Sequence, residues 1–270
     1  MARKIREQSQ NGVYHVMVRG IDRQEIFIDD YDRRMFLKIL KDNIQIPDKK
    51  DEGLKIRAFR LFSYCLMSNH AHLLIQEIEQ TSAQFMQRIC TRYAMYFNAK
   101  YTRIGHLFQD RFRSEPCNDV GYFLTLVRYI HQNPVKAGIC ETPEQYAWNS
   151  WNEIRFAAGQ PVSLPFADVC DKEALFDIAF FEELDHLVHL PVSDRDNCLD
   201  IDKVRIRINN DKVRCMIGEF CNLKSISDFV LLETEKQKQA VIRFLESGAT
   251  ISQICSITGM NRRVLCRLVE

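Results

Sequence analysis

The sequence predicts an α+β domain with an antiparallel sheet over residues 1–152, followed by α-helical segments that continue to the C-terminus. Short segments rich in β-branched and aromatic residues alternate with longer ones whose apolar residues recur at helical spacing. Two apolar segments joined by the turn Ser68-Asn69 form a hairpin, which makes their strands antiparallel. Hydrophobic residues make up 46% of the 270 residues, enough for a substantial core.

Three segments of the first domain have the composition of strands. Residues 13–19 are rich in valine and end near Gly20. Residues 54–67 begin with apolar alternation and end nearly all apolar, as expected of a long strand that enters the middle of a sheet. Residues 70–75 then return as its hairpin partner.

Three longer segments have helical periodicity. The first covers about residues 30–43 and the second covers residues 82–100. The third begins at a capping residue, 118 or 119. It is expected to end near Asn133, because Pro134 disfavours helical geometry in the residue before it. The order is therefore strand, helix, two strands, helix and a closing element around an antiparallel sheet.

Beyond residue 152 the sequence changes character. Residues 153–227 contain scattered prolines and an acidic stretch and are expected to form a connector with short helices, and helical periodicity resumes over 228–270. The basic and acidic residues number 22 and 17 over 1–150, 3 and 12 over 151–202, and 12 and 7 over 203–270. The overall charge of +1 thus combines two basic blocks and an acidic one, which indicates three units and does not exclude nucleic-acid binding.

The ten cysteines and the N-terminus indicate the compartment. No two cysteines stand closer than six residues, so CxxC zinc or redox sites are not expected. The basic N-terminus lacks the apolar stretch of a signal peptide, and no apolar run approaches the length of a membrane span. We therefore expect a cytoplasmic, nucleoid-associated protein with reduced thiols and no membrane partner.

Two histidines stand out on the predicted hairpin. His70 and His72 are two residues apart on a strand, so both imidazoles leave the same face of the sheet. Imidazoles at this spacing can converge on one divalent ion. A His-x-His pair alone is more often a pair of ordinary packed or solvent-facing histidines, but the apolar neighbours predict a central strand, where two polar rings need partners.

The third predicted helix supplies a tyrosine and an amide. Tyr129 and Asn133 are four residues apart, so the phenol and the carboxamide are neighbours on one helix face. A phenol beside an oxygen ligand, placed over two histidines, is a plausible nucleophile and metal site. The alternative is that Tyr129 is a boundary aromatic residue and Asn133 only a helix terminus.

Four segments in order carry a resemblance to a known family: YCLMSNHAHLL at 64–74, GHLFQDRFR at 105–113, RYIHQNPVKAG at 128–138 and YAWNSW at 146–151. Together they resemble the single-tyrosine HUH transposases of the IS200-like superfamily, specifically the REP-associated tyrosine transposase branch. The resemblance covers about residues 10–152. It implies a ferredoxin-like or RRM-like sheet with helices, the HUH endonuclease fold.

The resemblance also implies residue roles. His70 and His72 become ligands of Mg²⁺ or Mn²⁺, with Asn133 as the third ligand, a position that varies among relatives. Tyr129 becomes the nucleophile that attacks a phosphodiester of single-stranded hairpin DNA, leaving a 5′-phosphotyrosine and a free 3′-OH. Ala71 is smaller than the usual intervening residue, but its side chain points to the opposite face of the strand. Relatives that are homodimers place the tyrosine helix on the partner's histidines, so the chain is expected to be a monomer or a homodimer.

Basic residues interleaved with aromatic ones predict the DNA contacts, because cations neutralise phosphates and exposed rings stack on bases. The candidates in the first domain are Arg88, Arg92, Arg111, Arg113 and Lys136. The alternative for any one of them is that it lies on a solvated face and does not contact DNA.

The C-terminal region resembles a helix-turn-helix, with helices at 251–258 and 262–269 separated by Gly259. Such a unit places its second helix in the major groove of duplex DNA, and the candidate contacts are Arg262, Arg263 and Arg267. The alternative is a protein-binding or purely structural helical cap.

These features together predict a metal-dependent HUH DNA endonuclease and transposase that nicks and rejoins single-stranded DNA, with duplex binding through the C-terminal region. The alternative is a non-catalytic DNA-binding regulator on a transposase scaffold. The set of His70, His72 and Tyr129 favours the enzyme, because a protein that only binds DNA has no need of all three.

Overall fold

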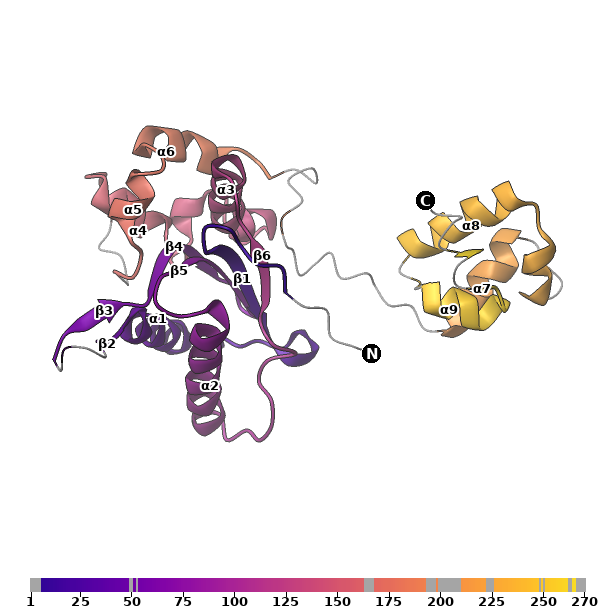
Figure 1. The fold of residues 1–270 in the computed structure, drawn as a ribbon, viewed down its shortest axis with the longest axis horizontal. Coiled ribbons are helices and arrows are strands. Elements are labelled where there is room, and N and C mark those ends of the chain that lie inside the picture. The colour runs from indigo at the N-terminus through magenta and orange to yellow at the C-terminus, as the bar shows by residue number, and fades with distance from the viewer. Residues whose placement is uncertain are drawn as a thin grey trace. The chain divides into compact units, whose positions relative to one another are not determined.

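The computed structural model describes residues 6–48, 51, 53–162, 168–192, 198, 210–221, 226–247, 249, 251–261 and 264–265. The chain divides into two compact units, Met1–Leu199 and Asp200–Glu270 (Figure 1). This division differs from the three units expected from the sequence, whose boundaries lay at residues 152 and 227. Each unit has its own hydrophobic core.

A four-stranded antiparallel sheet forms the centre of the first unit. Its strands are β1 (Val13–Arg19), β4 (Phe59–Leu66), β5 (His70–Glu77) and β6 (Arg113–Pro116). Their order in the sheet is β4-β5-β1-β6, and every neighbouring pair is antiparallel. Two split β-α-β units with this strand order make the ferredoxin-like fold, so the predicted fold class is confirmed.

The long strand expected over 54–67 is interrupted at Ala58. Residues before it form β3 (Lys55–Arg57), which pairs with β2 (Gln45–Pro47) in a separate two-stranded ribbon. The amide of Ala58 donates to the carbonyl of Ile44, and its own carbonyl accepts from the amides that follow β5. The backbone therefore changes hydrogen-bond partners at Ala58, which apolar patterning alone does not reveal.

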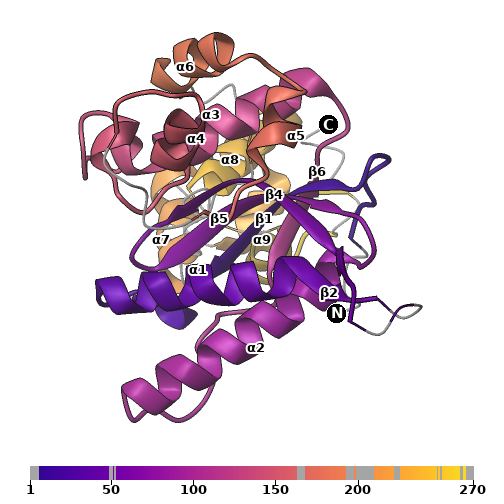
Figure 2. The ribbon, with the colours of Figure 1, turned by 90° about the vertical axis from the view of Figure 1, so that its left-hand side faces the viewer.

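Helices cover both faces of the sheet (Figure 2). On one face lie α1 (Asp30–Ile44) and α2 (Ser82–Lys100), which pack against each other. On the other face lies α3 (Val120–Lys136), which contacts β4 and β5. The three helices begin at Asp29, Thr81 and Asp119, each of which accepts a hydrogen bond from a backbone amide of the first turn.

The third helix continues past the predicted end at Asn133. α3 includes Pro134 in its last turn, where the proline cannot donate a hydrogen bond to the carbonyl one turn earlier. The amide of Ala137 donates to the carbonyl of Asn133, and the side chain of Asn133 donates to the carbonyl of Tyr129 at 2.7 Å. The predicted end was wrong because these bonds hold the last turn despite the local preference before proline.

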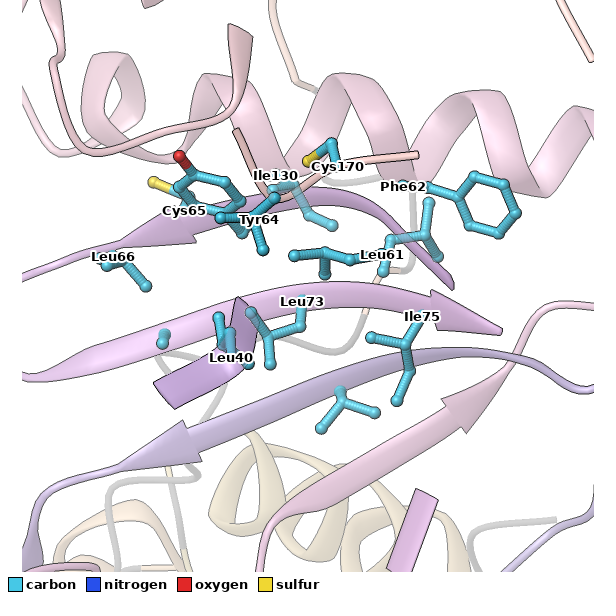
Figure 3. Close-up of a cluster of buried hydrophobic side chains, with 14 of the residues drawn as sticks. Leu40, Leu61, Phe62, Tyr64, Cys65, Leu66, Leu73, Ile75, Ile130 and Cys170 are labelled. Atoms are coloured by element: carbon cyan, nitrogen blue, oxygen red, sulfur yellow. The ribbon is translucent and has the colours of Figure 1, made fainter. Parts of the chain in front are cut away.

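The core lies on both faces of the sheet. Figure 3 shows part of it, with Leu40 of α1, Leu73 of β5 and Ile130 of α3, which are all completely buried. Each such side chain contributes roughly 1.5–3 kcal/mol when removed from water. The core therefore fixes α3, which carries the tyrosine, against the strand that carries the histidines.

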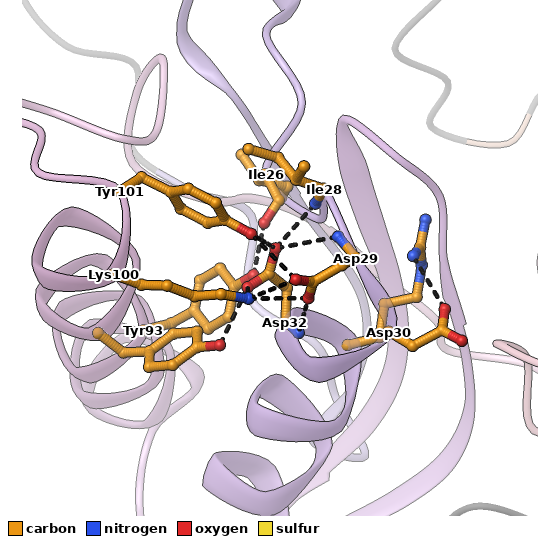
Figure 4. A network of polar contacts seen from close by, with 10 residues as sticks. Ile26, Ile28, Asp29, Asp30, Asp32, Tyr93, Lys100 and Tyr101 are labelled. Carbon is orange, nitrogen blue, oxygen red and sulfur yellow. Dashed lines mark hydrogen bonds and ion pairs between the residues drawn. The ribbon is translucent and has the colours of Figure 1, made fainter.

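A polar network ties the start of α1 to the end of α2 (Figure 4). The fully buried carboxylate of Asp32 accepts hydrogen bonds from Tyr96, Tyr101 and Lys100 at 2.8–3.0 Å. It also accepts from the backbone amides of Ile28 and Asp29. Burial alone would raise the pKa of Asp32, but these donors hold it below its ordinary value.

Residues that follow α3 extend the first unit. The elements are η2 (Pro143–Gln145), α4 (Trp151–Ala157), α5 (Lys172–Phe176) and α6 (Phe181–His189). The buried carboxylate of Glu153 accepts from the amides of Val169 and Cys170, both at 2.6 Å. The amide side chain of Gln132 on α3 donates to the carbonyl of Val188 on α6. The first part of the expected connector thus packs onto the first unit.

The second unit is helical. It contains α7 (Asn210–Cys221), η4 (Ile226–Leu231), α8 (Thr234–Glu246) and α9 (Ile251–Thr258), around a core that includes Ile217, Phe244 and Ile254. The predicted helix over 251–258 matches α9, and Gly259 follows it with a φ of 76°. Arg262, Arg263 and Arg267 lie outside the described residues. Within the described parts of both units, no helix is long and apolar enough to span a membrane.

Candidate active site on the central strands

The register of the two central strands places both predicted histidines on one face of the sheet. His72 of β5 lies opposite Met17 of β1, and His70 lies opposite Arg19. Residues directly opposite in an antiparallel pair share a face, and residues two apart on a strand do so as well. The face toward α3 therefore carries His70, His72 and Arg19.

His72 is completely buried and has one nitrogen engaged. Its Nδ1 lies 2.9 Å from Nε2 of His15, a hydrogen bond between two buried rings. Its Nε2 is buried and has no hydrogen-bond partner among the described residues. Burial and then the nearby His70, His15 and Lys136 hold the pKa of His72 well below its ordinary value. A neutral imidazole with a buried nitrogen that lacks a partner is the form that binds a divalent metal.

His70 is the more exposed of the two predicted histidine ligands. It is half-buried, and its Nδ1 lies 2.6 Å from Oδ1 of Asn69. Its ring centroid lies 5.0 Å from that of His72, with the ring planes at 87°. Because Nδ1 faces the Asn69 oxygen, Nε2 is the atom of His70 that suits a metal ligand.

Tyr129 of α3 lies against the histidines of the same chain. Its ring centroid is 5.6 Å from that of His72 and 5.8 Å from that of His15, with edge-to-face geometry in both pairs. Only 3% of Tyr129 is exposed. The ammonium of Lys136, at the end of the same helix, lies 5.9 Å from the Tyr129 ring centroid. The structure therefore brings together the predicted nucleophile and both predicted histidine ligands.

Asn133 lies one turn beyond Tyr129 and is largely buried. Its amide nitrogen donates to the carbonyl of Tyr129, so Oδ1 is the atom that suits a ligand role. Asn133 as the third ligand remains a prediction.

Sequence reasoning missed His15, whose ring packs against those of both His72 and Tyr129. It occupies the middle of β1, is completely buried, and pairs in register with Glu115 of β6. Its signal in the sequence was a single imidazole inside the apolar strand at 13–19, on the side of the strand shared with Arg19. Without the strand order, nothing indicated that β1 would lie beside β5.

The predicted DNA contacts fall on different sides of the sheet. Arg113 of β6 lies opposite Met17, so its side chain shares the face of His72, and it is exposed. Arg88 and Arg92 lie on α2, in the helix layer on the other face, where Arg92 lies 3.8 Å from Asp42 of α1. Arg111 is exposed in the loop before β6. The structure thus gathers Arg113 and Lys136, but not Arg88 and Arg92, on the histidine face.

A second group of metal-ligand type occurs away from this face. Within the described residues, donor atoms of Glu144, Asp185 and His189 lie close enough together to hold an ion. His189 lies 2.9 Å from Glu144, whose carboxylate also accepts a hydrogen bond from the indole of Trp151 at 2.7 Å. These contacts join α6 to η2 and account for the cluster as a structural tie.

The chain is similar to known proteins in structure and in sequence. A solved structure described as a REP-associated tyrosine transposase bound to a REP hairpin is similar over 63% of this chain and 94% of its own, with 18% identity and a TM-score of 0.46. No curated protein matches the sequence. Residues 8–133 match the family described as "Transposase IS200 like", a segment that holds the whole sheet and the histidine and tyrosine positions. This segment, slightly less than half of the chain, is thus similar to the IS200-like transposase family.

Proposed function

We propose that this protein is a transposase that nicks and rejoins single-stranded DNA with Tyr129 as the nucleophile. The observation that carries the proposal is the packing of the Tyr129 ring within 5.6–5.8 Å of the His72 and His15 rings in a single chain. A tyrosine used only for packing gains nothing from two adjacent buried imidazoles, whose burial costs free energy unless they are paired. The arrangement within one chain supports a complete active site in each monomer.

The covalent step exchanges one phosphodiester for another. The phenol oxygen of Tyr129 bonds to phosphorus, the bond from phosphorus to the 3′ oxygen breaks, and the phenol proton is lost while the 3′ oxygen takes up a proton. A 5′-phosphotyrosine and a free 3′-OH result. Rejoining is the reverse, in which a 3′-OH attacks the phosphotyrosine and releases the phenol. The phosphodiester bond energy is retained in the tyrosine link, so no other energy source is needed.

The side chains present fit a divalent ion. IS200-like transposases generally use one. Within the described residues the Nε2 of His72 has no hydrogen-bond partner, and together with the adjacent ring of His70 it forms a donor set of the correct type. His70, His72 and Oδ1 of Asn133 would hold Mg²⁺ or Mn²⁺. When bound, the ion polarises the scissile phosphate and offsets charge that develops on its oxygens.

The remaining charges of the histidine face orient the strand. Arg113 and Lys136 are exposed cations on or beside this face, and Arg19 lies next to His70. They neutralise phosphates on either side of the scissile bond.

The motifs shared with the REP-associated branch favour hairpin-forming repeats as substrates. The helix-turn-helix pattern after residue 250 favours duplex binding by the second unit through Arg262, Arg263 and Arg267.

The test is a covalent-adduct assay with the full chain, Mn²⁺ and 5′- and 3′-labelled single-stranded hairpin oligonucleotides. Wild type should yield an adduct that carries the 3′ part of the oligonucleotide and should release the 5′ part with a free 3′-OH. Tyr129→Phe should yield none. Tyr122→Phe, seven residues earlier on the same helix, is the matched control and should retain the adduct.

Equal adduct formation by Tyr129→Phe would refute the assignment of the nucleophile. Tight hairpin binding by wild type with no adduct for any hairpin, with Mg²⁺ or with Mn²⁺, would instead favour the alternative function, a DNA-binding regulator on a transposase scaffold.

A further inference from the structure

His15 has a place in the site that neither metal binding nor nucleophilic attack explains. It stands on the central strand β1, completely buried, with its ring stacked on His72 at a centroid distance of 5.1 Å and an interplanar angle of 21°. The ring of Tyr129 meets it edge-on. An imidazole in this position needs hydrogen-bond partners, since burial without them is costly.

The hydrogen bond between the two histidines has a direction that metal binding determines. A neutral imidazole carries one proton, so one nitrogen donates and the other accepts. For His72 to bind a metal through Nε2, that nitrogen must be unprotonated, which places its proton on Nδ1. His72 Nδ1 then donates to Nε2 of His15, 2.9 Å away, and His15 must in turn carry its proton on Nδ1.

The other end of His15 is suited to that tautomer. Its Nδ1 lies 3.8 Å from a carboxylate oxygen of Glu115, the residue directly opposite on β6. A negative charge at this distance stabilises a proton on the nearer nitrogen. The three side chains thus form a row across β6, β1 and β5. In these tautomers both imidazole protons are directed toward Glu115, which lies at ion-pair distance and not at hydrogen-bond distance, and the lone pair of His72 Nε2 is directed away.

From this row we infer that His15 is a positioning residue, which holds His72 in the tautomer and orientation that present Nε2 to the divalent ion. The inference rests on the proposed metal site. The second ring nitrogen of a metal-bound histidine usually donates a hydrogen bond to an acceptor outside the ligand set, often a carboxylate. Such acceptors tune the affinity of the site for the metal. Here His15 takes the place of that acceptor, and the opposite side of its ring faces the carboxylate of Glu115.

The first arm of the test uses the wild-type protein without metal. Two-bond ¹H–¹⁵N correlation spectra at pH 7.5 distinguish the Nδ1–H and Nε2–H tautomers of each histidine, with assignments from His15→Gln and His72→Gln. Both His15 and His72 should be Nδ1–H. A His72 ring protonated on Nε2, or a His15 ring protonated on both nitrogens, would overturn the inference without any need for catalysis.

The second arm measures Mn²⁺ affinity by calorimetry. His15→Leu should weaken binding by about 10–100-fold, as loss of an outer partner typically does. His15→Gln should restore much of the affinity, since its amide oxygen can accept from His72 Nδ1 in place of Nε2. Met17→Leu, a buried change on the same face of the same strand, is the matched control and should bind as wild type does.

The outcomes separate the two proposals. If wild type binds no Mn²⁺, the proposed metal site fails. If wild type binds and His15→Leu, folded by circular dichroism, binds equally well, only the positioning role of His15 fails. Direct coordination of Co²⁺ causes large changes in the ¹⁵N chemical shifts of the ligating histidine. If the His15 nitrogens show such changes when Co²⁺ is added, His15 is a ligand and the inference is wrong.

Discussion

His131 joins the tyrosine helix to strand β4, and its protonation should destabilise the first unit in acid. The ring is completely buried on α3. Its Nδ1 donates to the carbonyl of Val127 at 2.8 Å, and its Nε2 accepts from the hydroxyl of Ser150 at 2.8 Å. The Ser150 oxygen in turn accepts from the amide of Tyr64 on β4. A proton on Nε2 removes the acceptor and leaves a buried charge.

The size of the effect follows from the pKa. Burial lowers the pKa of His131 from 6.5 to about 4. Below pH 6.5 the unfolded chain takes up a proton that the folded protein does not, so the free energy of unfolding falls by about 1.4 kcal/mol per pH unit. At pH 5 the loss attributable to His131 is about 2 kcal/mol, and by pH 4 it approaches about 3 kcal/mol.

The assay compares urea unfolding of wild type and His131→Gln at pH 7.5 and pH 5. Both tryptophans, Trp148 and Trp151, lie in the first unit, so their fluorescence reports that unit alone. Glutamine can still accept from Ser150 but does not titrate, and His72 titrates in both proteins and cancels. Between pH 7.5 and pH 5 the free energy of unfolding of wild type should fall by about 2 kcal/mol more than that of the variant. Equal losses would show that His131 does not titrate as its burial implies.

Three further changes test other parts of the structure. Asp32→Asn should lower the free energy of unfolding of the first unit by about 1–3 kcal/mol, since a neutral amide replaces the fully buried carboxylate that accepts from two tyrosines, a lysine and two backbone amides, and an unchanged urea midpoint would contradict the network. Arg113→Ala should weaken single-stranded DNA binding and reduce its salt dependence by about one phosphate contact. Arg92→Ala, on the opposite face, should leave that salt dependence unchanged in the same fluorescence-anisotropy titrations, and the reverse order of effects would place the DNA on the helix layer. Removal of divalent ions with a chelator should abolish adduct formation and leave the helical circular dichroism signal unchanged, and loss of that signal would make the ion structural.

The strands and helices around the site could be predicted because each has a strong local pattern. Because side chains alternate between the two faces of a strand, His70 and His72 were predicted on one face of the sheet. Because residues four apart in a helix are neighbours, Tyr129 and Asn133 were predicted on one face of the helix. These signals lie within single elements and need no knowledge of the strand order.

The features that the sequence did not predict depend on which elements become neighbours. His15 becomes part of the site only because β1 inserts between β5 and β6, a pairing set by the crossovers and not by any residue of β1. Arg88 and Arg92 were predicted as DNA contacts because basic residues alternate with aromatic ones there; the sequence did not show that the apolar stripe of α2 docks on the sheet face away from the histidines. Periodicity shows that a helix has a buried side, not which face of the sheet it covers.

The acidic segment illustrates the same limit. Its prolines and charges predicted a connector with short helices, and α6 is such a helix, but its packing was not predicted: Leu184 and Val188 are completely buried and α6 packs against α3. Two apolar residues one turn apart are enough to dock a short helix once a hydrophobic surface is available.

The most direct test of Tyr129 as the nucleophile is peptide mapping of the trapped adduct. Wild type is incubated with Mn²⁺ and a hairpin oligonucleotide, digested with nuclease and protease, and analysed by mass spectrometry for a peptide that carries a 5′-linked nucleotide. We predict that the modified residue is Tyr129, with no such peptide from Tyr129→Phe. An adduct on any other residue, or cleavage to free 5′-phosphate ends without an adduct, would contradict the proposed mechanism.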